Sequence, residues 1–199
     1  MKLTSLIHEL FALQAIRFGS FTLKTGIISP IYIDLRLTIS KPQLLKTIAE
    51  DLYQAAKHSH FDLLCGVPYT ALPFATAISI EHNIPLILRR KEKKDYGTKK
   101  MVEGIFHSGQ SCLIVEDVVT SGSSILETVQ TLREEGLTVT DAAVLVNREQ
   151  GAEDLLAQQG IKLHSVLSLS HILKTLLAEN MIDHQTASSV SEFIQNHQV

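Results

Sequence analysis

The sequence predicts an α/β fold in which helices cover both faces of a central, mostly parallel sheet, with a small N-terminal hood over one sheet edge. Strand-like and helix-like segments alternate from about residue 62 onward, and the strand-like segments are short, nearly continuous apolar runs. Such runs are typical of parallel strands that are buried on both faces. Residues 1–38 break this alternation and therefore form the predicted hood.

The N-terminal elements are predicted from helical periodicity, alternation and turn residues. Apolar residues recur at helical spacing over 4–18, and Gly19 follows as a C-cap. Two short alternating strands come next, at 21–24 and 31–34, and a turn around Gly26 and Pro30 joins them. A capping box with Ser40 as N-cap and Gln43 three residues later then predicts a helix that runs to about Lys57.

The rest of the chain continues as alternating strands and helices. The predicted strands are 62–66, 86–89, 112–116, 139–146 and 162–167. The predicted helices are 70–81, 123–135, 153–159, 170–179 and 184–196. In open α/β sheets ligands bind beyond the carboxyl ends of the strands, so chemistry-bearing residues are expected directly after these strands.

Composition excludes several classes of protein. The chain has 199 residues, a formal net charge of −3, and 45% hydrophobic and 20% charged residues, which is typical of one globular domain spanning 1–199. Its apolar stretches are far shorter than the roughly 20 residues of a membrane span, and no cleavable signal segment is expected. Cys65 and Cys112 form no zinc-binding pattern and are expected to be small buried residues in a reducing compartment, the cytoplasm.

Basic charge is concentrated in residues 89–100, which read RRKEKKDYGTKK and carry a local charge of +5 in an otherwise acidic chain. A nucleic-acid-binding protein usually spreads basic charge over a face, so no nucleic-acid partner is expected. A solvated loop is the ordinary interpretation of such a run. The alternative is a flexible loop over 89–104 that closes on a small polyanion.

The most specific motif is CLIVEDVVTSGSS at 112–124. A predicted buried strand ends in Glu116 and Asp117, and the loop from Thr120 to Ser124 opens the next helix. Small residues at a helix N-terminus let backbone N–H groups converge on a phosphate. The lysine of a Walker A loop is absent, so nucleoside triphosphate hydrolysis is not expected. The carboxylates suit ribose hydroxyls and a developing positive charge on a sugar.

This motif resembles the phosphoribosyl-diphosphate (PRPP) binding motif of the type I phosphoribosyltransferases, and the chain is identified as a member of that family. Further segments resemble the orotate phosphoribosyltransferases in particular, and are closest to the transferase half of the bifunctional UMP synthases. These segments are FTLKTG at 21–26, SPIYIDLR at 29–36, CGVPYTALP at 65–73, the basic run at 89–100 and NREQG at 147–151. The resemblance implies the type I phosphoribosyltransferase fold.

The resemblance also implies an activity. Ribose 5-phosphate passes from PRPP to orotate, giving orotidine 5′-monophosphate and diphosphate in de novo UMP biosynthesis. Mg²⁺ is implied as the cofactor, held mainly by PRPP and water rather than by protein ligands. A cytoplasmic homodimer with shared active sites is implied, with no membrane partner, and a separate orotidine 5′-monophosphate decarboxylase is a candidate partner. Two alternatives remain: a phosphoribosyltransferase for another nucleobase, and a PRPP-binding regulator without turnover.

The resemblance assigns roles to individual residues. The PRPP-binding positions are Tyr69, Thr70, Arg90, Lys91, Lys94, Tyr96, Glu116, Asp117, Thr120, Ser121, Gly122, Ser123 and Ser124. The orotate-binding positions are Lys24, Tyr32, Thr120 and Arg148. The catalytic positions are Arg90, Lys91, Lys94 and Asp117.

Within these sets, Arg148 is expected to pair with the orotate carboxylate, which suits its planar guanidinium. Two positions depart from related proteins. Tyr96 stands where many bacterial enzymes have histidine, and Asn147 stands where the related eukaryotic domains have aspartate. Proton transfer by a loop histidine is therefore not assumed, and the effect of Asn147 on carboxylate binding is left open.

Overall fold

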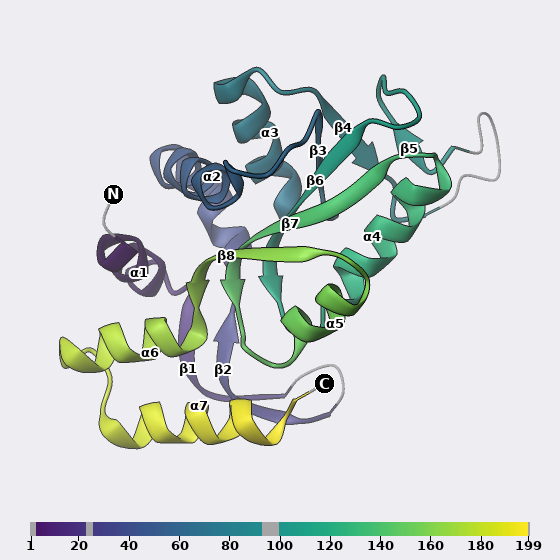
Figure 1. The fold of residues 1–199 in the computed structure, drawn as a ribbon. Coiled ribbons are helices and arrows are strands. Elements are labelled where there is room, and N and C mark those ends of the chain that lie inside the picture. The colour runs from purple at the N-terminus through teal and green to yellow at the C-terminus, as the bar shows by residue number, and fades with distance from the viewer. Residues whose placement is uncertain (1–2, 23–25, 93–99, 199) are drawn as a thin grey trace.

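A six-stranded sheet forms the centre of the computed structural model, which describes residues 3–22, 26–92 and 100–198 (Figure 1). The strand order is β5-β4-β3-β6-β7-β8, and all neighbours are parallel except β5, which runs antiparallel to β4. The strands are β3 (Leu63–Gly66), β4 (Leu86–Arg89), β5 (Val102–Glu103), β6 (Ser111–Val119), β7 (Thr138–Asn147) and β8 (Lys162–Ser168). The predicted, mostly parallel sheet is confirmed.

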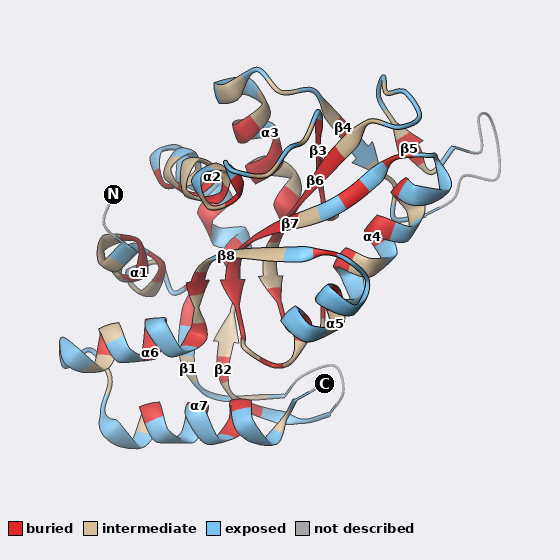
Figure 2. Ribbon diagram, viewed as in Figure 1, coloured by how far each residue is buried: buried red, intermediate tan, exposed pale blue. Residues whose placement is uncertain are grey.

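Helices cover both faces of this sheet. Figure 1 shows α2 (Pro42–Ala56) and α3 (Ala71–His82) on one side, and α4 (Ser123–Glu134) and α5 (Ala152–Gln158) on the other. Alternate residues of one strand therefore enter two separate cores. In β6, Leu113 and Val115 belong to the core with α2 and α3, whereas Cys112 and Ile114 belong to the core with α4 and α5. The central strands are consequently buried along most of their length (Figure 2), which explains their continuous apolar sequences.

The N-terminal segment and the last two helices lie together beyond the carboxyl ends of the central strands (Figure 1). The segment contains α1 (Leu3–Ala12), an antiparallel hairpin of β1 (Ile16–Thr22) and β2 (Ile28–Ile33), and a 3₁₀ helix, η1 (Leu35–Ser40). The last helices are α6 (Leu169–Ala178) and α7 (His184–Asn196), and α7 contacts β2.

The prediction of one helix over 4–18 was wrong. The helix ends at Ala12, and Gln14 adopts a left-handed conformation with φ of 61°. The N–H of Ala15 closes the turn by donating to the carbonyl of Leu10 at 2.9 Å. The apolar residues that follow, Ile16 and Phe18, fit the alternation of a strand as well as the spacing of a helix. Gly19 therefore lies inside β1 rather than at a helix end.

Other boundaries also differ from the predictions, among them the hairpin strands, which were predicted at 21–24 and 31–34 and are β1 and β2 in the structure. Ser40 ends η1 instead of capping the next helix, and α2 begins at Pro42 after Lys41, which forms no side-chain cap. Proline suits a first helical position because its missing N–H would have no partner there. Strand β6 continues to Val119 instead of ending at residue 116. Glu116 and Asp117 are therefore part of the strand, and Glu116 pairs with Val144 of β7.

The basic segment at 89–104 has an anchored base that the sequence did not predict. Strand β5 pairs with β4, and the N–H of Arg90 donates to the carbonyl of Met101 at 2.8 Å. Residues 93–99 of this segment lie outside the described residues. The two cysteines are free and buried as expected, and burial raises the pKa of Cys65 to about 11. Within the described ranges, no helix is long and apolar enough for a membrane span.

Candidate active site

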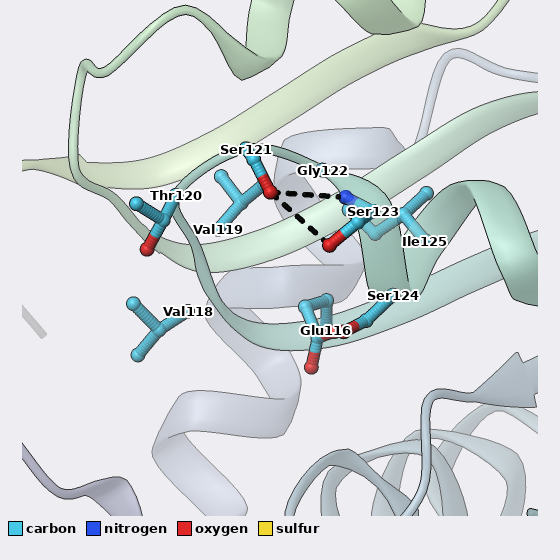
Figure 3. Close-up of a pocket in the computed structure, with 9 residues that line it drawn as sticks. All are labelled: Glu116, Val118, Val119, Thr120, Ser121, Gly122, Ser123, Ser124 and Ile125. Carbon is cyan, nitrogen blue, oxygen red and sulfur yellow. Dashed lines mark hydrogen bonds between the residues drawn. The ribbon is translucent and has the colours of Figure 1, made fainter. Parts of the chain in front are cut away.

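A small cavity lies where β6 meets α4, at the carboxyl edge of the sheet (Figure 3). Its volume is about 180 Å³, and it is lined by Glu116 and by residues 118–125. The Ser121 hydroxyl donates to the Ser123 hydroxyl at 3.1 Å and accepts from the Ser123 N–H at 3.4 Å. The loop from Thr120 to Ser124 thus curls around the cavity, and the structure brings these five predicted residues together.

Gly122 makes this loop possible. Its φ is +81°, in the left-handed region, and it immediately precedes the first residue of α4. A Cβ atom here would lie 3.3 Å from Cγ of Leu156 in α5. Gly122 is the N-cap of α4 and has no side chain that could accept a hydrogen bond from the first N–H groups of the helix. The partial positive charge of the helix N-terminus therefore faces the cavity. The cavity therefore suits a phosphate group.

Glu116 and Asp117 differ in their surroundings. Glu116 is 6% exposed and lines the cavity, and it accepts a 2.9 Å hydrogen bond from the N–H of Asp117. Burial, together with the neighbouring Asp117 carboxylate, raises the pKa of Glu116 to about 10. A neutral Glu116 at pH 7 removes one charge that would repel a phosphate. Asp117 is half-buried and does not line the cavity.

A second turn, from Gly66 to Thr70, lies beside this strand. The N–H of Val67 donates to the carbonyl of Val115 at 2.9 Å, directly before Glu116 in the chain. Gly66 is required for close packing, because a Cβ atom would lie 2.9 Å from the carbonyl oxygen of Ala71. Thr70 occupies the N-cap position of α3 but forms no side-chain cap.

Tyr69 links the second turn to the basic segment. Its side chain is 65% exposed, and the Lys91 ammonium lies 5.4 Å from the centre of its ring. The peptide bond between Pro68 and Tyr69 is cis. The structure therefore brings the predicted PRPP-binding residues Tyr69 and Lys91 together. Arg90 is engaged elsewhere, since its Nε donates to Glu103 at 2.7 Å. No sequence signal pointed to Glu103, which becomes a partner only through the β4–β5 pairing.

Arg148 is a buried cation beside the cavity. Arg148 directly follows β7 and is 9% exposed. Burial lowers the pKa of its guanidinium. Its N–H donates to the carbonyl of Val119 at 3.0 Å, which ties it to the strand that carries the cavity. Among the described residues, Nε and Nη2 of Arg148 are buried without a hydrogen-bond partner. An unpaired buried cation of this kind suits an anionic ligand group.

Of the other predicted orotate-binding residues that the structure describes, Thr120 lines the cavity and Tyr32 does not. Tyr32 lies in β2, where its ring centre is 5.5 Å from that of Phe21 and 5.0 Å from the Arg17 guanidinium carbon. Tyr32 does not line the cavity. The predicted residues Lys24, Lys94 and Tyr96 lie outside the described residues.

Comparison with known proteins agrees with this arrangement. A family model described as "Phosphoribosyl transferase domain" matches residues 38–162. Uridine 5′-monophosphate synthase of Bos taurus is 53% identical over 197 residues, covering 98% of this chain and 41% of that protein. Orotate phosphoribosyltransferase of Chlamydia felis is 43% identical over 192 residues, covering 96% of this chain and 93% of that protein.

A solved structure of Leishmania donovani UMP synthase is 36% identical with a TM-score of 0.89, and the match covers 98% of this chain and 43% of that chain. This chain thus spans less than half of the two UMP synthases, but nearly the whole of the chlamydial enzyme. The residues matched by the family model include the Gly66–Thr70 turn, the cavity at the start of α4 and Arg148. The chain therefore belongs to the phosphoribosyltransferase family and, within it, to the orotate phosphoribosyltransferases.

Proposed function

We propose that this chain transfers ribose 5-phosphate from PRPP to orotate, giving orotidine 5′-monophosphate and diphosphate. The observation that carries the proposal is Arg148, a buried guanidinium whose Nε and Nη2 have no partner among the described residues. A planar cation in this position suits a carboxylate, which orotate has and the other common nucleobases lack. The names of the chlamydial and bovine relatives support the same substrate.

In this proposal the cavity at the start of α4 holds the 5′-phosphate of PRPP. Thr120 to Ser124 supply backbone N–H groups and hydroxyls, and the α4 N-terminus adds partial positive charge. Glu116 and Asp117 bind the ribose hydroxyls. The Gly66–Thr70 turn and Lys91 bind the diphosphate, with Arg90 and Lys94 contributing from the basic segment. Lys24, Tyr32 and Tyr96 complete the proposed set.

The reaction replaces one bond at the ribose C1′ carbon with another. The bond from C1′ to the diphosphate oxygen breaks, and a ring nitrogen of orotate forms the new bond from the opposite face. Positive charge develops on the ribose and negative charge on the leaving diphosphate. Asp117 stabilises the positive charge on the ribose, and the basic side chains stabilise the negative charge on the diphosphate. Positioning and electrostatics therefore account for the catalysis.

Mg²⁺ is the proposed cofactor, and the side chains at the site fit a loosely held ion. Burial and the neighbouring Asp117 carboxylate raise the pKa of Glu116 to about 10, which makes Glu116 a poor ligand for a cation. The described part of the chain contains no group of three His, Cys, Asp or Glu residues placed to hold a metal ion. This donor set suits an ion that takes most ligands from PRPP and water. When bound, Mg²⁺ neutralises charge on the diphosphate oxygens.

The experiment that tests the activity is an absorbance assay with the protein, PRPP, Mg²⁺ and orotate. The proposal expects orotate absorbance to fall only when all components are present, and orotidine 5′-monophosphate to accumulate. Parallel reactions with uracil, adenine and hypoxanthine test the alternative base specificities. Turnover of one of these bases in preference to orotate contradicts the proposal, as does PRPP binding without any turnover.

The chain is further proposed to act as a cytoplasmic homodimer in which the basic segment at 89–104 closes over the partner's site. Two free, buried cysteines fit a reducing compartment. The contact of Lys91 with Tyr69 of the same chain supports a diphosphate-binding role for the start of this segment, whereas closure over the partner's site rests on the family resemblance. A separate orotidine 5′-monophosphate decarboxylase is the proposed functional partner, since the bovine relative that this chain matches in part is named a UMP synthase.

A further inference from the structure

The turn that follows Arg148 is fastened to the last two helices of the chain. We propose that Glu149 and Gln198 are positioning residues for Arg148, so that α6 and α7 hold its guanidinium ready for the substrate carboxylate. This inference rests on the proposed function, because it assumes that Arg148 binds the carboxylate of orotate.

The first fastening point is Glu149. Its backbone is left-handed, with φ of 58°, and its N–H donates to Oδ1 of Asn147 at 2.8 Å. Its own carboxylate accepts a 2.6 Å hydrogen bond from the N–H of Ser170, in the first turn of α6. A carboxylate at a helix N-terminus is favoured by the helix dipole. Glu149 therefore joins the turn to α6 while its backbone reverses the chain direction directly after Arg148.

The second fastening point is the end of α7. Nε2 of Gln198 donates to the carbonyl of Glu149 at 3.1 Å and to that of Ile194 at 2.6 Å. Nε2 of Gln150, a residue that is 4% exposed, donates to the carbonyl of His197 at 2.8 Å. Figure 1 shows the end of α7 close to the connection between β7 and α5. Together with the bond from Ser170, three hydrogen bonds thus hold the residues after Arg148: one to α6 and two to the residues that follow α7.

Arg148 needs such support for a physical reason. Its Nε and Nη2 are buried and have no partner in the part of the chain that the structure describes, and a long charged side chain in that state lowers its free energy by rotating into water. The packing around this buried side chain opposes that rotation, and a fixed backbone keeps the side chain in register with that packing. The bond from the Arg148 N–H to Val119 fixes one side of the residue, and the Glu149 clamp fixes the other. Binding a carboxylate to a preorganised cation then costs less ordering than binding to a mobile one.

The Glu149 side of the clamp is tested with two variants that differ in one property. Glu149→Ala removes the bond to Ser170, whereas Glu149→Gln keeps an oxygen that can accept it. We expect Glu149→Ala to raise the orotate KM about three- to tenfold, as the loss of one hydrogen bond allows. The PRPP KM should stay within about twofold, because the cavity and the Gly66–Thr70 turn do not use this bond. The orotate KM of Glu149→Gln should stay close to that of the wild type.

The α7 side is tested with Gln198→Ala, an exposed residue whose loss leaves the core intact. It should raise the orotate KM in the same selective way. Asp183→Ala is the matched control, because Asp183 caps the other end of α7 and accepts from the N–H of Thr186 at 2.7 Å without touching the turn. The control should lower the melting temperature and leave both KM values unchanged.

Combining the variants with Arg148→Ala separates this inference from the proposed function. If the clamp acts through Arg148, Glu149→Ala adds nothing to the orotate KM once Arg148 is gone. A selective rise in the orotate KM for Arg148→Ala, with none for Glu149→Ala or Gln198→Ala, overturns only the clamp. An equal effect of Glu149→Ala with and without Arg148 also overturns it. An Arg148→Ala variant whose orotate KM is unchanged overturns the proposed carboxylate contact itself.

Discussion

The N–H of Arg148 donates a 3.0 Å hydrogen bond to the carbonyl of Val119, the last residue of β6. Val119 directly precedes the Thr120–Ser124 loop, so this bond joins the backbone of Arg148 to the strand that carries the phosphate-binding cavity. The neighbouring pair Val119 and Asn147 lies in register in the parallel ladder of β6 and β7. The two halves of the proposed site therefore share a rigid frame at the carboxyl edge of the sheet.

The role of Arg148 predicts a substrate-selective effect. Arg148→Ala should raise the orotate KM about ten- to a hundredfold, because a charge-assisted hydrogen bond contributes on the order of 1.5–3 kcal/mol. Arg148→Lys keeps a charge but lacks the planar fork, so it should recover only part of that loss. Initial rates with each substrate varied in turn measure both KM values. Equal increases in the orotate and PRPP KM values would contradict a carboxylate-specific contact.

Asp117 predicts a loss of rate rather than of binding. Asp117→Asn removes a negative charge that is proposed to stabilise the positively charged ribose, and such a preorganised contact typically contributes about 10²–10³ in rate. The kcat should fall by that factor while the fold persists, since Asp117 is only half-buried. Steady-state kinetics and circular dichroism check the two statements. Wild-type turnover in this variant removes Asp117 from the mechanism.

Local signals predicted the central part of the fold well. Strand β4 has the predicted bounds 86–89, and the cavity loop lies between strand and helix as expected, because turn residues and continuous apolar runs act over short distances. The N-terminal helix was overextended, because Ile16 and Phe18 satisfy two periodicities at once. Strand β5 was missed, because two residues carry no periodicity and pair only through the tertiary fold.

The candidate site was predicted in the same uneven way. Thr120 to Ser124 are adjacent in the sequence, so their loop could be recognised from composition. The raised pKa of Glu116 depends first on burial by other elements, and the lack of a partner for Nε and Nη2 of Arg148 among the described residues depends on the tertiary fold, so no local pattern encodes either. The roles of Lys24, Lys94 and Tyr96 stay predictions that rest on the family resemblance.

Gly66 predicts a purely steric effect on PRPP binding. In Gly66→Ala the new Cβ would lie 2.9 Å from the Ala71 carbonyl oxygen and 3.1 Å from Leu72 Cα, so the start of α3 must shift. We expect the unfolding free energy to fall by about 1–3 kcal/mol and the PRPP KM to rise more than the orotate KM. Gly109→Ala is the control, since it introduces strain at φ of +90° in open space far from this turn in sequence. A Gly66→Ala variant with unchanged PRPP KM would separate the turn from the diphosphate.

The buried carboxyl of Glu116 predicts a pH dependence of stability. Its pKa rises from 4.5 to about 10 on folding, mainly through burial. The folded state therefore keeps a proton that the unfolded state releases, and the unfolding free energy falls as the pH rises from about 4.5 towards 10. The slope from this one group is at most about 1.4 kcal/mol per pH unit.

Glu116→Gln removes that titration, so it should lose less stability than the wild type between pH 6 and pH 9. Urea unfolding at the two pH values measures the difference. Glu153→Gln, at an exposed position in the first turn of α5, serves as the control for loss of a carboxylate and should follow the wild type. Identical pH profiles for Glu116→Gln and the wild type would show that Glu116 is ionised in the folded protein.

The proposed closure of the basic segment over a partner's site predicts complementation between two inactive variants. Lys94→Ala removes a proposed diphosphate contact, and Asp117→Ala removes the ribose contact. In a homodimer with shared sites, each mixed dimer holds one site that has both residues intact. Mixing the variants should therefore recover activity to at most about half per mixed dimer, once subunit exchange is shown independently by native mass spectrometry. Demonstrated exchange with activity no higher than that of the separate variants means that the segment serves its own subunit.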